Sequence, residues 1–350
     1  MKTLADCREQ IHSCSKCGLC QSVCPIYKIT GNDCTVSRGQ FLMLQGLLRG
    51  EYKMSKTINK YLDICLKCGA CSKFCPSGID VVDIIALAKA EYYKAHFFEK
   101  IISFFQKYLV FGFGLNLMKL FSQNRKSQKF EKKVIYFGGC GGKLEGNASV
   151  VKLLNSCGVE VVAPDFDCCG IPFFVRGDMD NFNEAAKKFY EVIQKYNISE
   201  VVTSCASCEK TLKSYKKWFD TDEVKVRNVY EYIRENNLKL KLNKKLKVTI
   251  HKPCNMSNFG DVEWILSNTE NLEYIKMKDF DSCCGFNGLT KPKQYKVTGN
   301  LFKAKQNNII DTGCKYVLTS CLGCKTALSS TSFGKYKVKD FAEFLNKYIK

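Results

Sequence analysis

The spacing of apolar residues predicts helices in the first part of the chain. An apolar run over residues 41–48 is expected to form a helix, with Ser37 as its N-cap and Gly50 at its end. A second helix is expected over residues 81–93. Its buried face is expected to carry Ile84, Leu87, Ala88 and Tyr92. We interpret residues 1–95 as one largely helical domain.

From residue 133 onward, short apolar strands alternate with helices, as in the βαβ units that build parallel sheets. Strands are expected at residues 134–137, 159–163, 201–204, 247–250, 272–275 and 316–319. The spacing of apolar residues predicts helices at 181–196 and 301–310. This part of the chain is therefore expected to be α/β.

Residues 96–132 are expected to link the two parts. They include the most apolar stretch of the chain, 97–121, whose longest uncharged run, 108–118, is much too short to span a membrane. We expect this stretch to pack on one of the domains. A peripheral contact with a membrane is the alternative, because several basic residues follow the stretch.

One cysteine pattern occurs twice in the helical part. Residues 14–25 and 65–76 both read C-x2-C-x2-C-x3-C-P, the spacing of bacterial two-cluster ferredoxins. The fourth cysteine of each copy lies too far round its loop and is expected to ligate the other cluster. One [4Fe–4S] cluster is therefore assigned to Cys14, Cys17, Cys20 and Cys75, and the second to Cys65, Cys68, Cys71 and Cys24. Zinc sites would require paired C-x2-C motifs without the third cysteine and the C-P ending.

Cysteine content points to the same chemistry, because 22 of the 350 residues are cysteines. The first ten residues contain charged side chains and no apolar segment typical of a secretory signal. We therefore expect the reducing cytoplasm, where thiolate clusters survive, with the inner face of the membrane as an alternative. The cysteines outside the motifs, expected to be free or core thiols, are Cys7, Cys34, Cys157 and Cys314.

The formal net charge of +20 raises the question of a nucleic-acid partner. The lysines are scattered along the whole chain, however, and each four-thiolate cluster subtracts about 2 charges. We expect no nucleic acid. An acidic protein partner or an anionic membrane surface agrees better with the sign of the charge.

The α/β part contains an internal repeat of cysteine motifs. Thr-Ser-Cys-x-x-Cys begins at Thr203 and again at Thr319, and Cys-Cys-Gly begins at Cys168 and again at Cys283. The first set is Cys140, Cys168, Cys169, Cys205 and Cys208, and the second is Cys254, Cys283, Cys284, Cys321 and Cys324. Two similar lobes, residues 133–240 and 241–350, are expected to pack about a pseudo-twofold axis.

The cysteines of each lobe follow predicted strands, so they should converge at the carboxyl edge of a sheet. Each set could hold a metal cluster, and the alternatives are zinc or a vestigial lobe without metal. The glycines of residues 138–142 lack the spacing of a phosphate-binding loop. No dinucleotide fingerprint occurs in the chain, so flavin or NAD chemistry is expected on another chain.

These motifs resemble the iron–sulfur subunit of glycolate oxidase and the related lactate and glycerol-3-phosphate dehydrogenase subunits. The resemblance covers nearly the whole chain and includes Cys24-Pro-Ile-Tyr27, Ser37-Arg-Gly39 and Cys75-Pro-Ser-Gly78. It implies an α+β ferredoxin-like, largely helical N-terminal domain, followed by two pseudo-symmetric α/β lobes of the cysteine-rich CCG type.

Similar CCG domains in heterodisulfide reductase subunits use five cysteines to hold non-cubane [4Fe–4S] clusters. The resemblance therefore implies two cubane clusters and one or two further clusters in the lobes. The second lobe reads His251-Lys-Pro-Cys254-Asn255 where the family often has H-D-P-C-H, and we interpret His251 as structural.

The function implied by the resemblance is electron transfer. A partner subunit containing FAD would oxidise glycolate or D-lactate, and this chain would pass the electrons to a quinone or another acceptor. One alternative is a catalytic subunit that reduces a disulfide at a CCG cluster, as in heterodisulfide reductase. Another is the membrane-attaching subunit of anaerobic glycerol-3-phosphate dehydrogenase.

Overall fold

The structure is a computed structural model, and it describes residues 2–108, 124–219, 223–286 and 295–348, with the isolated residues 114, 117, 122 and 221. The chain divides into two compact units. Unit 1 consists of Met1–Phe104, Pro172–Phe182 and Ser282–Lys303. Unit 2 consists of Phe105–Ile171, Asn183–Asp281 and Ala304–Lys350.

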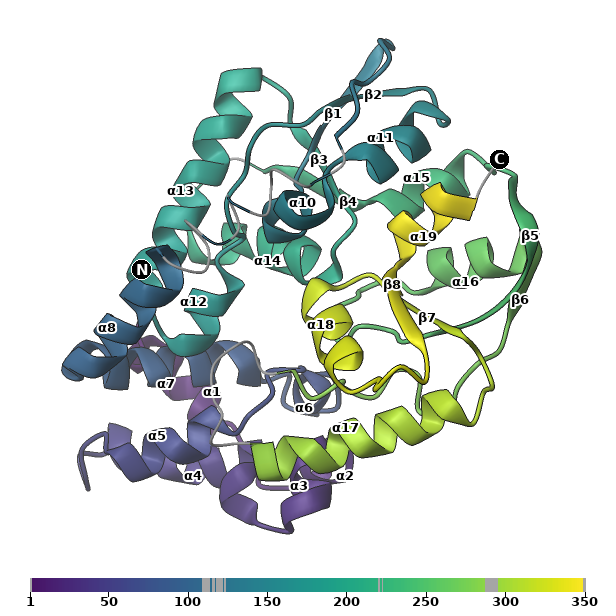
Figure 1. Ribbon diagram of the computed structural model, residues 1–350. Helices are drawn as coiled ribbons and strands as arrows, with labels where there is room; N and C mark the ends of the chain where they lie inside the picture. The colour runs from purple at the N-terminus through teal and green to yellow at the C-terminus, as the bar shows by residue number, and fades with distance from the viewer. Residues whose placement is uncertain are drawn as a thin grey trace. The chain divides into compact units, whose positions relative to one another are not determined.

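Unit 1 is helical throughout its described N-terminal part (Figure 1). Its helices are α1 (Arg8–His12), α2 (Leu19–Val23), α3 (Pro25–Thr30), α4 (Ser37–Leu48), α5 (Lys56–Asp63), α6 (Ala70–Lys73), α7 (Val81–Ala95) and α8 (Phe97–Phe105), which ends just inside unit 2. The short 3-10 helices are Ala5–Cys7 and Asp33–Thr35. The first helix predicted from the sequence corresponds to α4, but its N-cap is Val36, and Ser37 is already helical. That detail of the prediction is wrong.

The core of unit 1 is centred on α7. Ile84, Leu87, Ala88 and Tyr92 are buried as the spacing predicts, but so are side chains on other faces of the helix. Lys89 is one of them: its ammonium lies 2.7 Å from the Asp63 carboxylate on α5, and both side chains are almost fully buried. The same ammonium donates a hydrogen bond to the Val175 carbonyl. Burial of both charges is tolerated because they are paired.

The segment that begins with α12 (Ile171–Arg176) packs its backbone against α7. Gly177 has φ of +90°, and a Cβ atom there would lie 2.6 Å from the backbone nitrogen of Ala90. The next residue, Asp178, accepts a hydrogen bond of 2.9 Å from the Tyr93 hydroxyl. Glycine is thus required at 177 both for its left-handed backbone and for the close contact with the helix.

Gly177→Ala is therefore expected to destabilise the protein by about 2–4 kcal/mol, since it adds overpacking to left-handed strain. Gly31→Ala is the matched control, because Gly31 also has positive φ (+59°) but no atom of the described residues lies within 4 Å of its Cβ position. That variant should lose only about 1 kcal/mol. Chemical denaturation measures both values, and equal losses would show that the contact with α7 contributes nothing.

Unit 2 contains, among the described residues, two four-stranded sheets with the same strand order, β2-β1-β3-β4 and β6-β5-β7-β8. All neighbouring strands are parallel. The strands are β1 (Lys132–Tyr136), β2 (Val159–Val162), β3 (Glu200–Thr203), β4 (Lys225–Asn228), β5 (Leu240–Ile250), β6 (Thr269–Tyr274), β7 (Tyr316–Thr319) and β8 (Lys337–Asp340). Parallel strands require crossovers, and helices supply them.

The helices of this α/β part are drawn with the strands in Figure 1. They are α10 (Gly139–Glu145), α11 (Ala148–Asn155), α13 (Met179–Tyr196), α14 (Ala206–Trp218), α15 (Val229–Glu235), α16 (Gly260–Ser267), α17 (Tyr295–Ile310), α18 (Leu322–Ser330) and α19 (Phe341–Tyr348). Of these, α13 and α17 extend across the division between the units. The expected helices at 181–196 and 301–310 fall within them.

One hydrophobic core joins the two sheets of unit 2. It includes Val134 on β1, Val248 on β5 and the helices between them. The rings of Tyr230 on α15 and Phe341 on α19 lie 5.1 Å apart within it. Two sheets that share one core cannot shift independently, so the loops at their edges are held in fixed positions.

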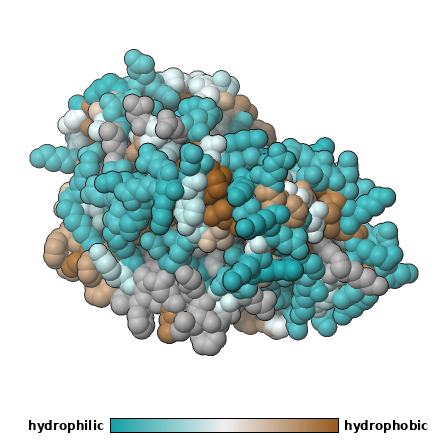
Figure 2. All heavy atoms as spheres, turned by 90° about the horizontal axis from the view of Figure 1, so that it is seen from above, coloured by the Kyte–Doolittle hydropathy of each residue, from teal (hydrophilic) through white to brown (hydrophobic). Residues whose placement is uncertain are grey.

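No helix in the described part of the chain is long and apolar enough to cross a membrane. The uncharged run at 108–118, which suggested the alternative of a peripheral contact, lies almost wholly outside the described residues. On α8, Phe97 and Phe98 are exposed. The face drawn in Figure 2 is mostly hydrophilic, with apolar side chains in separate patches.

Candidate metal centres

The two ferredoxin-type loops of unit 1 have the same backbone conformation. Gly18 and Gly69 have φ of 81° and 75°, and each is the N-cap of a short helix, α2 or α6. Lys16 and Lys67, two residues earlier, also have positive φ, of 57° and 51°. Each left-handed pair curls the chain so that successive cysteines face the inside of the loop. The repeated C-x-K-C-G sequence therefore encodes a repeated backbone shape.

The cysteines of these loops line two cavities in unit 1. The first cavity is bordered by Cys14, Cys17, Cys20, Cys71 and Cys75. The second is bordered by Cys24, Cys65, Cys68 and Cys71. The fourth cysteine of each motif thus lies at the cavity of the other motif, as the crossed assignment requires. The ligand sets themselves remain a prediction.

Two of the thiols at these cavities, Cys24 and Cys71, are made harder to deprotonate by burial. Removal from water raises the pKa of Cys24 to about 11, although the Tyr27 backbone N–H donates to its sulfur at 3.4 Å. Burial also raises the pKa of Cys71. Cluster ligands are thiolates, so the positive charge of iron would have to hold the protons off. The residues present therefore fit a cationic metal centre at each cavity.

In unit 2, the cysteines of the first set follow strands of the first sheet. Cys140 lies in α10 after β1, Cys168 and Cys169 follow β2, and Cys205 is the N-cap of α14 after β3. This placement at the carboxyl ends of parallel strands is the one expected from the sequence. Cys168, Cys169 and Cys208 are buried.

The thiols of this first set lie within hydrogen-bonding reach of one another. Cys168 contacts Cys140 and Cys169, Cys169 contacts Cys208, and Cys208 contacts Cys205. Contact with the Cys140 thiol, together with burial, raises the pKa of Cys168. The series is, in order, Cys140, Cys168, Cys169, Cys208 and Cys205. The structure therefore brings together all five predicted residues of the first lobe.

Neighbouring residues fix this thiol cluster. The Tyr215 hydroxyl on α14 donates to the Cys169 carbonyl at 2.9 Å. A Cβ at Gly139 would lie 3.6 Å from the Cys208 sulfur, so the glycine-rich loop passes directly beside the cluster. These contacts hold the loops after β1, β2 and β3 against one another.

The second set is placed in a similar way on the second sheet. Cys254 follows β5, Cys321 is the N-cap of α18 after β7, and Cys324 lies in the first turn of that helix. The Cys283 sulfur accepts a hydrogen bond of 3.4 Å from the Gly285 N–H. Cys283 and Cys284 belong to unit 1, whereas the other cysteines of the set belong to unit 2. Assembly of the second set thus remains a prediction.

The C-x2-C motifs of the two lobes adjoin within unit 2. Cys205 is in hydrogen-bonding contact with Cys321. The Ser207 hydroxyl lies 3.2 Å from the Cys321 sulfur, and the Ala206 N–H donates to the Ser320 carbonyl at 2.8 Å. Sequence reasoning did not find this contact, because nothing in either motif indicates which surface of the other lobe it meets.

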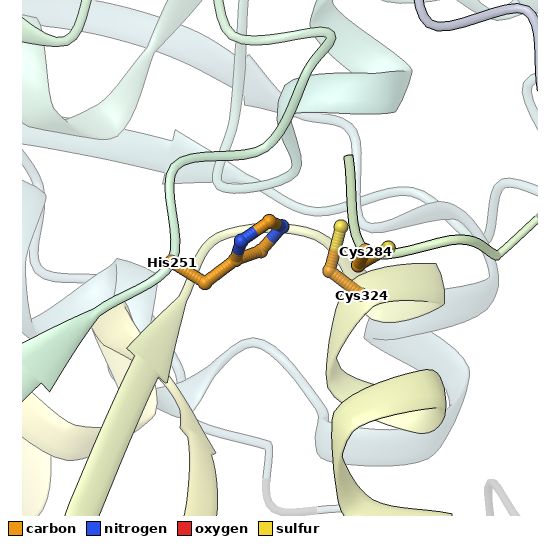
Figure 3. A group of neighbouring side chains, drawn as sticks. All are labelled: His251, Cys284 and Cys324. Atoms are coloured by element: carbon orange, nitrogen blue, oxygen red, sulfur yellow. The ribbon is translucent and has the colours of Figure 1, made fainter. Parts of the chain in front are cut away.

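His251 is a polar residue that the sequence interpretation left without a chemical role. It follows β5 directly, its side chain is fully buried, and neither ring nitrogen has a hydrogen-bond partner among the described residues. A ring nitrogen and the Cys324 sulfur lie within 4.8 Å of each other. Figure 3 shows the ring pointing toward Cys324; the third residue drawn, Cys284, belongs to unit 1.

A cavity of about 520 Å³ lies beside the glycine-rich loop of the first lobe. Its lining includes Arg125, Lys126, Tyr136, Gly139, Gly142 and Lys143. The Lys143 ammonium is buried and pairs with Asp167 at 2.7 Å. Because the sequence lacks a phosphate-loop pattern, the spacing of the glycines gave no reason to expect a cavity here.

The cysteines outside the motifs are dispersed. The Cys157 thiol donates to the Tyr232 carbonyl, and the Cys314 thiol donates to the Thr312 carbonyl, each at 3.7 Å. Cys7 and Cys34 are half-buried and do not line either cavity of unit 1. Their role as free or core thiols remains a prediction.

Cysteine-lined cavities in a helical unit, together with clustered thiols at the edges of parallel sheets, define an iron–sulfur protein. The 4Fe-4S dicluster domain matches residues 10–79, and the cysteine-rich domain matches residues 134–213 and 248–329. The chain therefore belongs to the family of iron–sulfur proteins that combine a 4Fe-4S dicluster domain with CCG-type cysteine-rich domains.

Several relatives match this chain over most of its length. An uncharacterized iron-sulfur protein of Methanococcus maripaludis is 27% identical, over 98% of this chain and 69% of its own. The glycolate oxidase iron-sulfur subunit of Escherichia coli is 22% identical, over 97% and 94%. One subunit of the dihydromethanophenazine:CoB–CoM heterodisulfide reductase of Methanosarcina acetivorans is 22% identical, over 91% and 88%.

One solved structure supports the fold alone. A hypothetical protein from Helicobacter pylori superposes with a TM-score of 0.53 at 10% identity, over 92% of this chain and 69% of that one.

Proposed function

We propose that this chain is the iron–sulfur electron-transfer subunit of a flavin-dependent 2-hydroxy acid dehydrogenase. The observation that carries the proposal is the combination of two cysteine-lined cavities in unit 1 with a continuous series of thiols in unit 2. Iron–sulfur clusters held there would supply one-electron redox chemistry. Relatives named as glycolate oxidase iron-sulfur subunits match nearly the whole chain.

In this proposal the protein's own residues position and insulate the redox sites. The loops at Lys16 and Lys67 direct cysteines into the cavities of unit 1. In unit 2, the buried Tyr215 and the backbone at Gly139 enclose the first thiol cluster. Burial and hydrogen bonds to sulfur are the means by which proteins tune cluster potentials. The ligand assignments and the domain limits at residues 95, 132 and 240 are part of the proposal.

In this proposal a partner subunit must donate electrons to these sites. A 2-hydroxy acid loses two electrons and two protons when it becomes a 2-oxo acid, whereas each cluster accepts one electron at a time. A flavin accepts the pair and releases single electrons, and the sequence contains no nucleotide fingerprint of its own. The partner is therefore proposed to be a subunit containing FAD, and the acceptor a quinone or another electron carrier. A peripheral contact with a membrane is compatible with this role.

The isolated chain is accordingly expected to oxidise neither glycolate nor D-lactate with any dye acceptor. Co-expression with a flavoprotein encoded beside it should give a co-purifying complex that has the activity. The net charge of +20 should favour an acidic partner, and added salt should then weaken the complex. Turnover by the flavin-free chain alone would refute the proposal.

The contact between the two C-x2-C motifs favours a second candidate function. In this candidate the chain is a heterodisulfide reductase-like catalytic subunit that reduces a disulfide at a CCG cluster, and the contact between Cys205 and Cys321 would bring cysteines of both lobes close to one substrate. Reduction of a disulfide by the isolated, cluster-loaded chain would support this candidate over the first. An anaerobic glycerol-3-phosphate dehydrogenase subunit is the remaining alternative, and dye reduction with glycerol 3-phosphate by the co-expressed complex would identify it.

A further inference from the structure

The backbone at His251 is fixed at the carboxyl edge of the second sheet. Its N–H donates to the Leu318 carbonyl on β7 at 2.9 Å. The side chain is 0% exposed, and neither Nδ1 nor Nε2 has a partner in the part of the chain that the structure describes. A buried polar group that is left unpaired destabilises the folded state, so a compensating interaction is expected.

Two buried hydroxyl groups close to His251 are also unpaired. Thr249 precedes it by two residues on β5 and therefore shares its face of the sheet. Thr319 follows Leu318 on the neighbouring strand β7. Neither hydroxyl has a partner among the described residues. The end of this sheet thus gathers several buried polar groups whose hydrogen-bonding capacity is unused.

The first sheet shows that the fold does not need a histidine at this place. The Phe137 N–H donates to the Val202 carbonyl at 2.8 Å, the same contact that His251 makes with Leu318. Phe137 is buried, and its ring packs against Phe166 with a centroid distance of 4.6 Å. An apolar side chain fills the position without leaving an unpaired nitrogen. The backbone geometry alone therefore does not account for histidine at position 251.

The position of Cys324 indicates what the imidazole faces. Its thiol is buried in the first turn of α18, within 4.8 Å of a His251 ring nitrogen (Figure 3). Imidazole and thiolate are both ligands for iron and for zinc. Histidine also replaces cysteine on one iron of some clusters. We propose that His251 is a nitrogen ligand of the iron–sulfur centre in the second lobe, beside Cys324, and this inference rests on the proposed function in which the lobes bind iron–sulfur clusters.

The test uses full-length protein purified without oxygen and labelled with ¹⁵N-histidine. Hyperfine spectroscopy of the reduced protein should show a strong coupling to histidine nitrogen that is lost in His251→Phe. Phenylalanine is chosen because Phe137 fills the same place in the first sheet. His251→Gln is a second variant that keeps a polar side chain and should also lose the coupling. Thr249→Val is the matched control, since it alters a buried polar group on the same strand face and should retain the coupling.

The outcomes separate this inference from the proposed function. Cluster signals without histidine coupling in the wild type, or with coupling that persists in both His251 variants, overturn the role of His251 while the proposed function stands. The other histidines, His12 and His96, remain in every variant and would then be the source of a persistent coupling. Metal analysis that finds no iron beyond the ferredoxin clusters overturns the role of His251, and absence of iron from the ferredoxin cavities as well overturns the proposed function.

Discussion

Protein isolated without oxygen is expected to contain clearly more than the roughly eight iron atoms that two cubane clusters require. Cys208→Ala should remove up to about four of the additional atoms. Cys208 is buried and is the fourth of the five thiols in the first-lobe series, where it joins Cys205 to Cys169. Its loss divides the series and leaves too few adjacent thiols to hold a cluster. Iron and zinc analysis per chain, with quantified protein, measures the effect.

Cys157→Ala is the matched control for this measurement. Cys157 also lies in the first lobe, but its thiol donates to the Tyr232 carbonyl and contacts none of the motif cysteines that surround Cys208. Its replacement should leave the iron content unchanged. Iron near eight in the wild type, with zinc present, would show instead that the lobes hold zinc.

Most of the strand positions could be predicted from the sequence, because burial in a parallel sheet leaves a run of apolar residues. The strand expected at 316–319 is observed as β7 (Tyr316–Thr319). The strand expected at 247–250 is longer in the structure, since β5 begins at Leu240. Its first half alternates buried and exposed residues among lysines, and pairing with β6 determines its extent.

The outer strands β4 and β8 were not predicted. They read Lys-Val-Arg-Asn and Lys-Val-Lys-Asp, and so contain a single apolar residue each. Pairing with β3 and β7 makes them strands, and that information is tertiary. The helices that follow them, α15 and α19, bring Tyr230 and Phe341 together in the core shared by the two sheets.

The candidate sites, like the strands, could be predicted from the sequence only in part. Local spacing was sufficient to identify the cysteines, because a cluster loop is encoded within a dozen residues. The contact between Cys205 and Cys321 depends on how the lobes pack, and the buried His251 is bonded through its backbone to β7, more than sixty residues away in the sequence. Such long-range features leave no pattern in a single sequence.

Crossed ligation in unit 1 predicts which cysteine variants will lose the same cluster. Cys24→Ser and Cys65→Ser should abolish one cluster signal, because both residues line the second cavity. Cys75→Ser and Cys14→Ser should abolish the other, because both line the first. Each variant should lose up to about four iron atoms, and EPR of the reduced protein distinguishes the two signals.

The crossed pairs are informative because Cys24 and Cys65 are 41 positions apart and Cys14 and Cys75 are 61 apart, whereas uncrossed ligation would pair Cys24 with Cys14 and Cys75 with Cys65. Serine keeps the size of the side chain, so loss of a cluster should reflect the missing thiolate and not a packing defect. Cys34→Ser is the matched control, since this half-buried cysteine of the same unit borders neither cavity and its replacement should leave both signals intact. If Cys24→Ser and Cys14→Ser removed the same signal, each loop would hold its own cluster and the crossed assignment would be wrong.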